Sequence, residues 1–216
     1  LSQVTDVTGD LFITTPSINN SPLTDISGLN NLITVGGRLT LFNLKFLNAT
    51  NLFPNLREVG SGVNGDGLFI VGFTPANISG FNALFNVSGD LAVQNTIYLV
   101  TLNGFNALTK VKPLSSNNQA MLYFSNNRAL TNINGFGILN EISWDYFFIN
   151  NPSLVALPNT PLLTIIGKTI TINKCHSLVN FNGINNLTTI INGNLNISQN
   201  DNLSSLDGLD SLSICY

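Results

Sequence analysis

The stretch ITINKCHSLVNFNGINNL (residues 170–187) is followed by LNISQNDNLSSLDGLDSL (residues 195–212), which has nearly the same pattern. In both stretches, an apolar pair two residues apart is followed by apolar residues 8, 11, 14 and 17 positions after the first. A repeat of this length indicates stacked units, none of which can bury its own apolar side alone. The pattern therefore predicts a solenoid whose core forms only between neighbouring turns.

The same pattern extends along the whole chain. The first residue of each apolar pair serves as a marker for one turn of about 24 residues. Eight markers are found: Leu11, Leu39, Leu68, Leu91, Leu122, Tyr146, Ile170 and Leu195. Residues 1–216 are therefore expected to form a single domain of about eight turns.

Each turn reads as three short strands. The first, such as Leu91-Ala92-Val93, alternates with period two, as a strand with one buried face does. The second centres on pairs such as Leu99 and Leu102. The third ends at an apolar residue in every turn: Val35, Val59, Val87, Val111, Ile142, Ile166, Ile190 and Cys215. Gly, Asn or Pro interrupts every candidate helix, which favours an all-β fold.

Two recurring features are expected at the bends. A short polar residue followed by Gly, as in Ser79-Gly80 and Asn103-Gly104, predicts a turn after the second strand, because Gly tolerates positive φ. A corner after the first strand holds one polar or small residue in several turns: Thr96, Asn127, Asn151, Cys175 and Asn200. These corner side chains either form a buried hydrogen-bonded ladder or are exposed turn formers, and we favour the ladder.

Composition excludes two classes of partner. Only 9% of the residues are charged and the net charge is −3, with no basic cluster to neutralise a phosphate backbone, so a nucleic-acid partner is not expected. The mean hydropathy is +0.27, but no apolar run approaches the ~20 residues that a membrane-spanning helix needs. The apolar content is distributed in short alternating pieces, as strands require.

The start of the chain falls within a turn. Leu1, Val4 and Val7 have the spacing of the last third of a repeat, and no secretory leader is present. We expect the chain to be a processed or excised part of a longer protein.

The repeat resembles that of a known family. Leu195-x-Ile197-x-x-Asn200-x-x-Leu203 followed by Leu206-x-Gly208-Leu209-x-x-Leu212 is similar to the repeat of receptor L-domain-like proteins, which are relatives of leucine-rich repeats. The resemblance spans nearly the entire chain and implies a three-sided right-handed parallel β-helix. The family includes hormone-binding receptor ectodomains, fungal wall-anchored proteins and microbial surface proteins. The resemblance therefore implies an extracellular or cell-surface location. The chain departs from the receptor ectodomains, since it has two cysteines and no Cys-rich neighbour.

The outward positions of the first strands are the candidate binding face. Six turns place an aromatic or aliphatic residue there, whereas the outward positions of the other strands are mostly polar. Such apolar surface marks an interaction site, is covered by another part of the parent protein, or reflects a slipped alignment. Insertions at 15–22, 60–67 and 112–120 adjoin these strands. The candidate residues for a protein or glycan ligand are Phe12, Phe42, Phe69, Val71, Tyr123, Trp144, Phe147 and Ile149.

Six Asn-x-Ser/Thr sequences fit the acceptor pattern for N-glycosylation, as in a secreted or surface glycoprotein. The acceptors are Asn48, Asn77, Asn86, Asn186, Asn196 and Asn202. Because Asn is frequent in this chain, each match is weak by itself.

No catalytic site, metal site or cofactor is expected. His176 is the sole histidine, and its neighbour Cys175 occupies an inward position, so a catalytic pair is disfavoured. Asp10, Asp90 and Asp145 recur just before the first strand, where they are either calcium ligands or, as we favour, turn formers.

Two functions remain. The first is a surface or secreted recognition module that binds a protein or a glycan through the first strands. The second is a structural subunit of an extracellular filament, wall or sheath that self-associates through that face and the solenoid ends.

Overall fold

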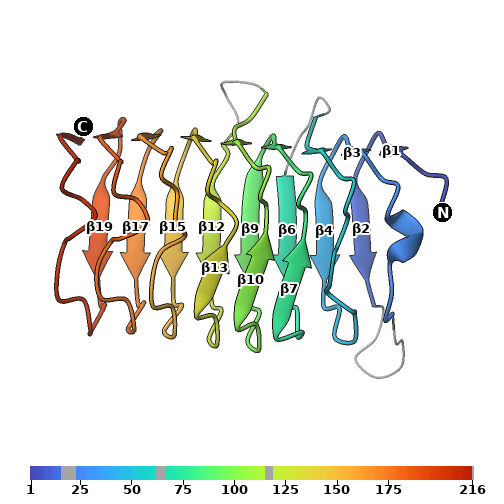
Figure 1. Cartoon of the computed structure of the whole chain (residues 1–216), viewed down its shortest axis with the longest axis horizontal. Coiled ribbons are helices and arrows are strands. Elements are labelled where there is room, and N and C mark those ends of the chain that lie inside the picture. The colour runs from blue at the N-terminus through green and yellow to red at the C-terminus, as the bar shows by residue number, and fades with distance from the viewer. Residues whose placement is uncertain (16–22, 62–66, 115–118, 216) are drawn as a thin grey trace.

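A computed structural model describes residues 1–15, 23–61, 67–114 and 119–215. The chain is an all-β parallel solenoid of about eight turns, with three parallel sheets along its sides and the two termini at opposite ends (Figure 1). Its helical content within those ranges is one 3-10 turn, η1 (Ser27–Leu29). Among these residues, no helix has the length and apolar character to cross a membrane.

The first strands form an eight-stranded sheet in the order β19-β17-β15-β12-β9-β6-β4-β2. All eight predicted markers are paired in register, from Leu11 with Leu39 to Ile170 with Leu195, so the predicted alignment of the turns is confirmed. The strands are β2 (Leu11–Thr14), β4 (Leu39–Phe42), β6 (Gly67–Val71), β9 (Asp90–Gln94), β12 (Leu122–Ser125), β15 (Tyr146–Ile149), β17 (Ile170–Asn173) and β19 (Leu195–Ser198).

The third strands are only two residues long and form a nine-stranded sheet. The predicted last residues pair in one column, from Val7 through Val35 to Cys215. The strands are β1 (Asp6–Val7), β3 (Thr34–Val35), β5 (Glu58–Val59), β8 (Asn86–Val87), β11 (Lys110–Val111), β14 (Glu141–Ile142), β16 (Ile165–Ile166), β18 (Thr189–Ile190) and β20 (Ile214–Cys215).

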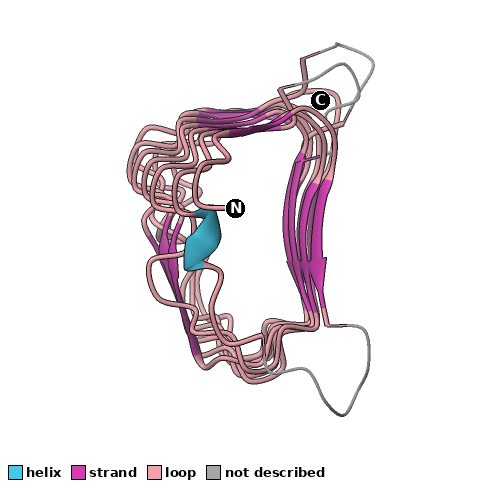
Figure 2. Cartoon of the chain, turned by 90° about the vertical axis from the view of Figure 1, so that its right-hand side faces the viewer, coloured by secondary structure: helices cyan, strands magenta, loops and turns pink. Residues whose placement is uncertain are grey.

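The second side is less regular than predicted. Among the described residues it has three strands, β7 (Asn77–Gly80), β10 (Thr101–Gly104) and β13 (Asn132–Asn134), rather than one in each turn. In the sixth turn, Pro158 and Pro161 lack the N–H that a parallel ladder needs. The view along the axis shows the three sides enclosing one interior (Figure 2).

The interior is filled by columns of apolar side chains, one residue from each turn. Leu39, Leu68, Leu91 and Leu122 are fully buried, as the markers predicted. A second column consists of stacked rings, with centroid separations of 5.6 Å between Phe53 and Phe81, 5.1 Å between Phe81 and Phe105, and 5.3 Å between Phe105 and Phe136. Offset aromatic stacking adds to the free energy of burial.

The buried polar ladder at the corner is confirmed. Asn127 Oδ1 accepts hydrogen bonds from the backbone N–H of Thr96 at 3.1 Å and from its hydroxyl at 2.6 Å. Asn151 Oδ1 in turn accepts from the Asn127 backbone N–H at 3.2 Å and its side-chain amide at 3.0 Å. All three side chains are buried. Cys175 interrupts the ladder, and Asn200 resumes it by accepting from the Cys175 N–H at 2.8 Å.

The bend after the first strand has a left-handed backbone residue in seven of the eight turns. These residues stack in a column, and their N–H groups extend the sheet ladder, as Asn126 does by donating to the Ile149 carbonyl at 3.0 Å. Asn and Gly tolerate this conformation best, which explains most of the column. The members are Asn43, Gly72, Asn95, Asn126, Asn150, Lys174 and Gln199, with φ between 54° and 65°.

The polar-Gly turn prediction is confirmed in part at Gly80 and Gly104. Both have the predicted positive φ, 150° and 152°, but they are the last residues of β7 and β10, and the chain bends one residue later, where Phe81 and Phe105 have φ of 55° and 59°. Gly is required for a second reason, because a Cβ atom on Gly104 would clash with the Gly80 carbonyl oxygen in the turn below. Close stacking of backbones and positive φ together select glycine here.

The core assignment can be tested at two adjacent residues. Leu99 is fully buried, whereas Val100 is 38% exposed. We expect Leu99→Asp to lower the free energy of unfolding by more than ~4 kcal/mol, because it places an unpaired charge between stacked turns. Val100→Asp, the matched control, should cost less than ~1 kcal/mol. Denaturant titration measures both, and equal losses would contradict the assigned interior.

Candidate recognition face

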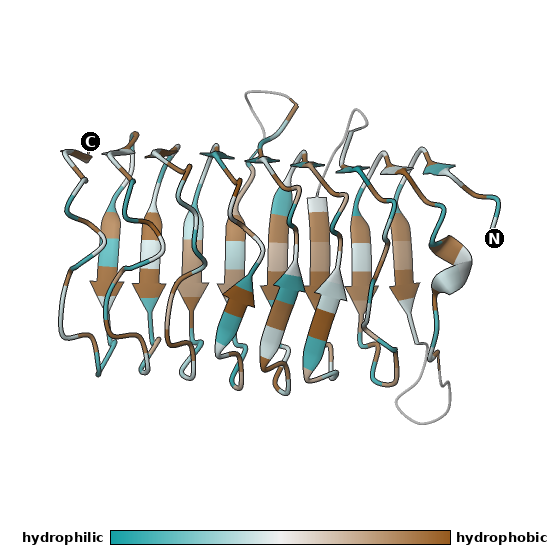
Figure 3. Ribbon diagram, viewed as in Figure 1, coloured by the Kyte–Doolittle hydropathy of each residue, from teal (hydrophilic) through white to brown (hydrophobic). Residues whose placement is uncertain are grey.

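The outward side chains of the eight-stranded sheet form two columns that run along the solenoid axis. We call this surface the strand face. One column contains Phe12, Thr40, Phe69, Ala92, Tyr123, Phe147, Thr171 and Asn196, and the other contains Thr14, Phe42, Val71, Gln94, Ser125, Ile149, Asn173 and Ser198. None of these side chains carries a charge. In Figure 3, most of the bands along the eight-stranded sheet are hydrophobic (brown) or of intermediate hydropathy (white), whereas the middle of β19 is hydrophilic (teal).

The most exposed apolar residues lie at the N-terminal end of the strand face. Phe12 is 61% exposed and Phe42 is 37% exposed, and their rings stack with centroids 6.2 Å apart. They line a hollow of about 460 Å³ with Phe69, Val71, Thr40, Leu11, Asp10 and Arg38. The Arg38 guanidinium carbon lies 4.7 Å from the centre of the Phe69 ring, which is a cation–π contact. This hollow combines ring surfaces with one positive and one negative group.

A second aromatic cluster lies further along the same face. Tyr123 and Phe147 are partly buried, and their rings meet edge to face at 6.1 Å. Ile149 adjoins them in the other column, also partly buried. Trp144 lies two residues before β15, and the Lys168 ammonium lies 4.1 Å from its ring centre. The predicted site residues therefore form two groups rather than one continuous patch.

The two clusters are separated by small and polar side chains. Ala92 is 1% exposed, and Gln94 beside it is partly exposed. Thr40 and Ser125, which the pattern placed on the outward columns, are only 8% and 3% exposed, because large neighbours cover them. Beyond Ile149 the face becomes polar. The predicted loops beside the face at 15–22, 60–67 and 112–120 lie partly outside the described residues, which leave out 16–22, 62–66 and 115–118.

The recurrent aspartates have a structural role. Asp10 Oδ1 accepts the Arg38 N–H at 2.7 Å, Asp90 Oδ1 accepts the Met121 N–H at 2.9 Å, and Asp145 Oδ1 accepts the Thr169 N–H at 2.8 Å. Each carboxylate thus binds the backbone of the next turn just before its first strand. Within the described part of the chain, no group of three or more His, Cys, Asp or Glu side chains could hold a metal ion.

The two cysteines differ sharply in environment. Cys175 is fully buried, and burial raises the pKa of its thiol to about 11. His176 points elsewhere, with Nδ1 2.8 Å from Asp201 Oδ2. Cys215 continues the inward column of the third strands but is exposed in the last described turn. Both thiols are free. An activated thiolate requires a lowered pKa, so Cys175 is a packing residue.

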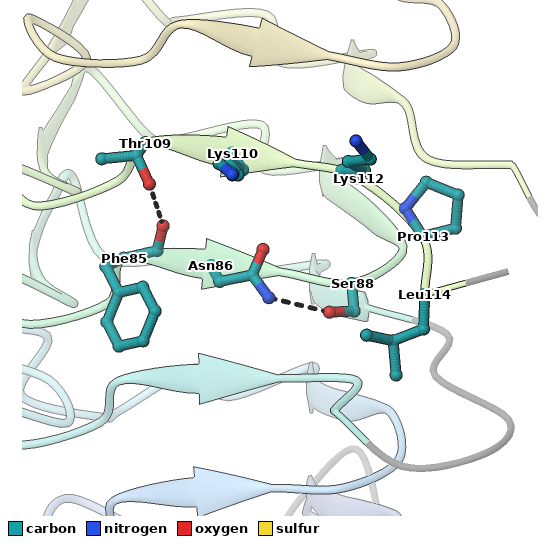
Figure 4. Close-up of a pocket in the computed structure, with 8 residues that line it drawn as sticks. All are labelled: Phe85, Asn86, Ser88, Thr109, Lys110, Lys112, Pro113 and Leu114. Carbon is teal, nitrogen blue, oxygen red and sulfur yellow. Dashed lines mark hydrogen bonds between the residues drawn. The ribbon is translucent and has the colours of Figure 1, made fainter. Parts of the chain in front are cut away.

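A second hollow, of about 500 Å³, lies over the nine-stranded sheet (Figure 4). Its lysines are engaged by Glu141, which lies 2.7 Å from Lys112 and 4.0 Å from Lys110. Asn86, a predicted glycosylation acceptor, donates to the Ser88 hydroxyl at 2.9 Å and is partly buried there. The other acceptors are exposed: Asn48, Asn77, Asn186, Asn196 and Asn202. The sequence pattern did not signal this hollow, because its walls come from different turns.

No family model, curated protein or solved structure matches the chain.

Two aspartates should shift stability with pH in opposite directions. Burial raises the pKa of Asp145, and the hydrogen bond from the Thr169 N–H and the charge of Lys168 partly oppose this shift. The contribution of Asp145 to stability is therefore fully present below about pH 3.8 and is lost as the pH rises through the raised pKa. The Thr34 and Thr5 hydroxyls donate to Asp6 and lower the pKa of its carboxyl group. The contribution of Asp6 to stability is therefore present above about pH 3.8 and is lost as the pH falls through the lowered pKa. Thermal melting between pH 3 and pH 7 should show Asp145→Asn gaining stability relative to the wild type as pH rises, and Asp6→Asn losing it. Parallel pH trends for the two variants would contradict these assignments.

The thiols offer a test of the buried column. An aromatic disulfide reagent at pH 8 should label Cys215 in the native protein and reach Cys175 only after denaturation, since the Cys175 thiol is buried and has a raised pKa. Cys215→Ser should abolish native labelling, and labelling that persisted in this variant would show that Cys175 is accessible.

Proposed function

We propose that this chain is an extracellular or cell-surface recognition module that binds a protein or a glycan through the strand face. The observation that carries the proposal is the exposed aromatic cluster of Phe12 and Phe42 beside a hollow with Arg38 and Asp10. Concave, mostly apolar sites with a few polar groups are typical of ligand binding. Rings on a surface also provide large contact area at a low cost in conformational entropy.

Three further features support a location outside the cell. Five of the six acceptor asparagines are exposed, so glycans could be attached without disturbing the core. Amides and hydroxyls replace most of the charged groups that soluble domains usually carry. The repeat resembles that of receptor L-domain-like proteins, and the eight-turn parallel solenoid is compatible with membership of that group.

A structural subunit is the second candidate. It is favoured by apolar surface at the two ends of the described solenoid: a hollow of about 480 Å³ at the first turn, lined by residues such as Val4, Leu11 and Ile26, and exposed Leu206 in the last turn. In a structural subunit, these surfaces would contact another copy of the chain. Sedimentation equilibrium over a wide range of concentration separates this candidate from a monomeric recognition module.

The strand face can be tested with two matched triple variants. Phe69→Ser/Tyr123→Ser/Phe147→Ser removes three rings from the face. Phe46→Ser/Phe85→Ser/Tyr98→Ser removes two phenylalanines and one tyrosine that are exposed elsewhere. On glycan arrays and on panels of purified surface proteins, the first variant should lose at least ~10-fold in affinity, or ~1.4 kcal/mol, and the second should not.

Both variants should melt near the wild-type temperature, because their changes are on the outside of the turns. Equal binding by the two variants and the wild type would rule out the strand face as the recognition surface. Loss of concentration-dependent assembly in the first variant alone would instead favour the structural subunit.

A further inference from the structure

The two aromatic clusters form a narrow line along the solenoid axis. We call the line from Phe12 to Phe147 the aromatic strip, with members Phe12, Phe42, Phe69, Val71, Tyr123, Phe147 and Ile149. It crosses six turns and hence five steps of ~4.8 Å, so its length is ~24 Å. Its two columns are two residues apart along each strand, or ~7 Å. The strip is therefore several times longer than it is wide.

These dimensions discriminate between kinds of partner. A strip of ~24 by ~7 Å has an area on the order of 170 Å², whereas a stable protein interface buries about 800 Å² on each side. The remaining outward positions of the sheet, from Thr171 to Ser198, are polar and provide no extension of the apolar surface. A long, thin ligand fits this shape better than a globular one.

We propose that the aromatic strip binds a neutral, extended β-1,4-linked glycan that lies along the solenoid axis, an inference that rests on the recognition function proposed above. Each face of an equatorially substituted pyranose ring presents axial C–H groups, which pack against aromatic rings. An extended chain of such sugars advances by a distance close to the ~4.8 Å spacing of the turns, so successive sugars lie over successive turns. Phe69 and Tyr123 are two turns apart, which places them under alternate sugars with the same ring face downward.

The polar groups of the strip suit hydroxyl groups. Gln94 lies between the two clusters, and within the described chain no other residue forms a hydrogen bond with its side-chain amide. An amide can donate to one sugar hydroxyl and accept from another. At the N-terminal end, Asp10 and Arg38 bring an acceptor and a donor group to the hollow under the Phe12 ring. A few polar groups among rings are the usual way in which a site fixes ligand orientation.

Charge selects the class of glycan. The one charged residue within the eight first strands is Asp90, at the start of β9, and its carboxylate accepts the Met121 N–H. The one basic and one acidic residue of the hollow, Arg38 and Asp10, offset each other. A sulfated or uronic acid chain would find no line of cations along the strip. The surface is therefore matched to an uncharged polymer of glucose or N-acetylglucosamine.

Isothermal titration calorimetry with oligosaccharides of defined length tests the inference. Cellohexaose and chitohexaose are the probes, and maltohexaose is the α-linked control with the same number of sugars. At least one β-1,4-linked hexamer should bind at least ~10-fold more tightly than the corresponding dimer, because six sugars reach both clusters whereas two reach one. Maltohexaose, which curves, should bind no better than a dimer.

Three variants locate the binding. Phe12→Ser and Tyr123→Ser each remove one ring, the first from the N-terminal cluster and the second from the other cluster, and should reduce the length dependence. Gln94→Ala should weaken the hexamer by a smaller factor, ~3–10-fold, as expected for one hydrogen bond. Phe85→Ser, which removes an exposed ring from the nine-stranded sheet, is the control and should bind like the wild type.

The outcomes separate this inference from the broader function. Absence of binding by both β-1,4-linked hexamers, or equal binding of maltohexaose, overturns the glycan inference. If a protein ligand then depends on Phe69, Tyr123 and Phe147, the recognition function stands with another partner. If no ligand of any class responds to those residues, both proposals fail.

Discussion

The structure depends on one constraint: each turn must lie in register on the next, because no turn can bury its apolar residues alone. In-register stacking places Leu39, Leu68 and Leu91 in one column, where each covers the next. The parallel backbone ladder satisfies the peptide groups between them. Burial and hydrogen bonding are therefore obtained by the same geometry, and neither is available to an isolated repeat.

Because neighbouring turns lie at the spacing of β-strands, only certain residues fit at the bends. The backbones of neighbouring turns come close at Gly104, where a side chain would meet the carbonyl of Gly80. At the other corner, a left-handed residue redirects seven of the eight turns, and in most of them its N–H stays in the ladder. The Thr96–Asn127–Asn151 ladder inside that corner satisfies the polar groups that the bend buries. Where Cys175 replaces asparagine, its thiol makes longer contacts, of 3.6 Å with the Phe148 carbonyl and 3.8 Å with the Asn173 carbonyl.

The same register that builds the core also organises the outer surface. A residue type that is repeated at one outward position forms a line of side chains along the axis, and the backbone and core stay the same. On the strand face this produces rings in five of the first six turns, with Ala92 and Gln94 in the fourth, and hydroxyls and amides in the last two. A solenoid thus provides an elongated surface whose chemistry changes along its length, which is suited to elongated partners. Beside it, Asp10, Asp90 and Asp145 each tie one turn to the next.

The repeat period was enough to predict the fold class, the number of turns, the register of the first and third strands, and the buried corner ladder. Such predictions succeed because each residue of a solenoid packs against the equivalent residue of the adjacent turn, so the repeat alone defines its contacts. The sequence also identified which side chains lie outward, since strand alternation allows only two directions. It did not indicate that proline-containing and irregular turns leave the second side with few strands, or that Gly80 and Gly104 serve close stacking.

Only the tertiary structure decided how exposed each outward residue is. Thr40 and Phe12 occupy one column, yet Thr40 is 8% exposed and Phe12 is 61% exposed, because exposure depends on the size of neighbours in the adjacent turns. The same holds for the hollow at Arg38 and Phe69, whose walls come from turns about 28 residues apart in the chain. Direction is a property of one strand, but concavity and coverage are properties of several turns together, and for that reason only the folded chain reveals them.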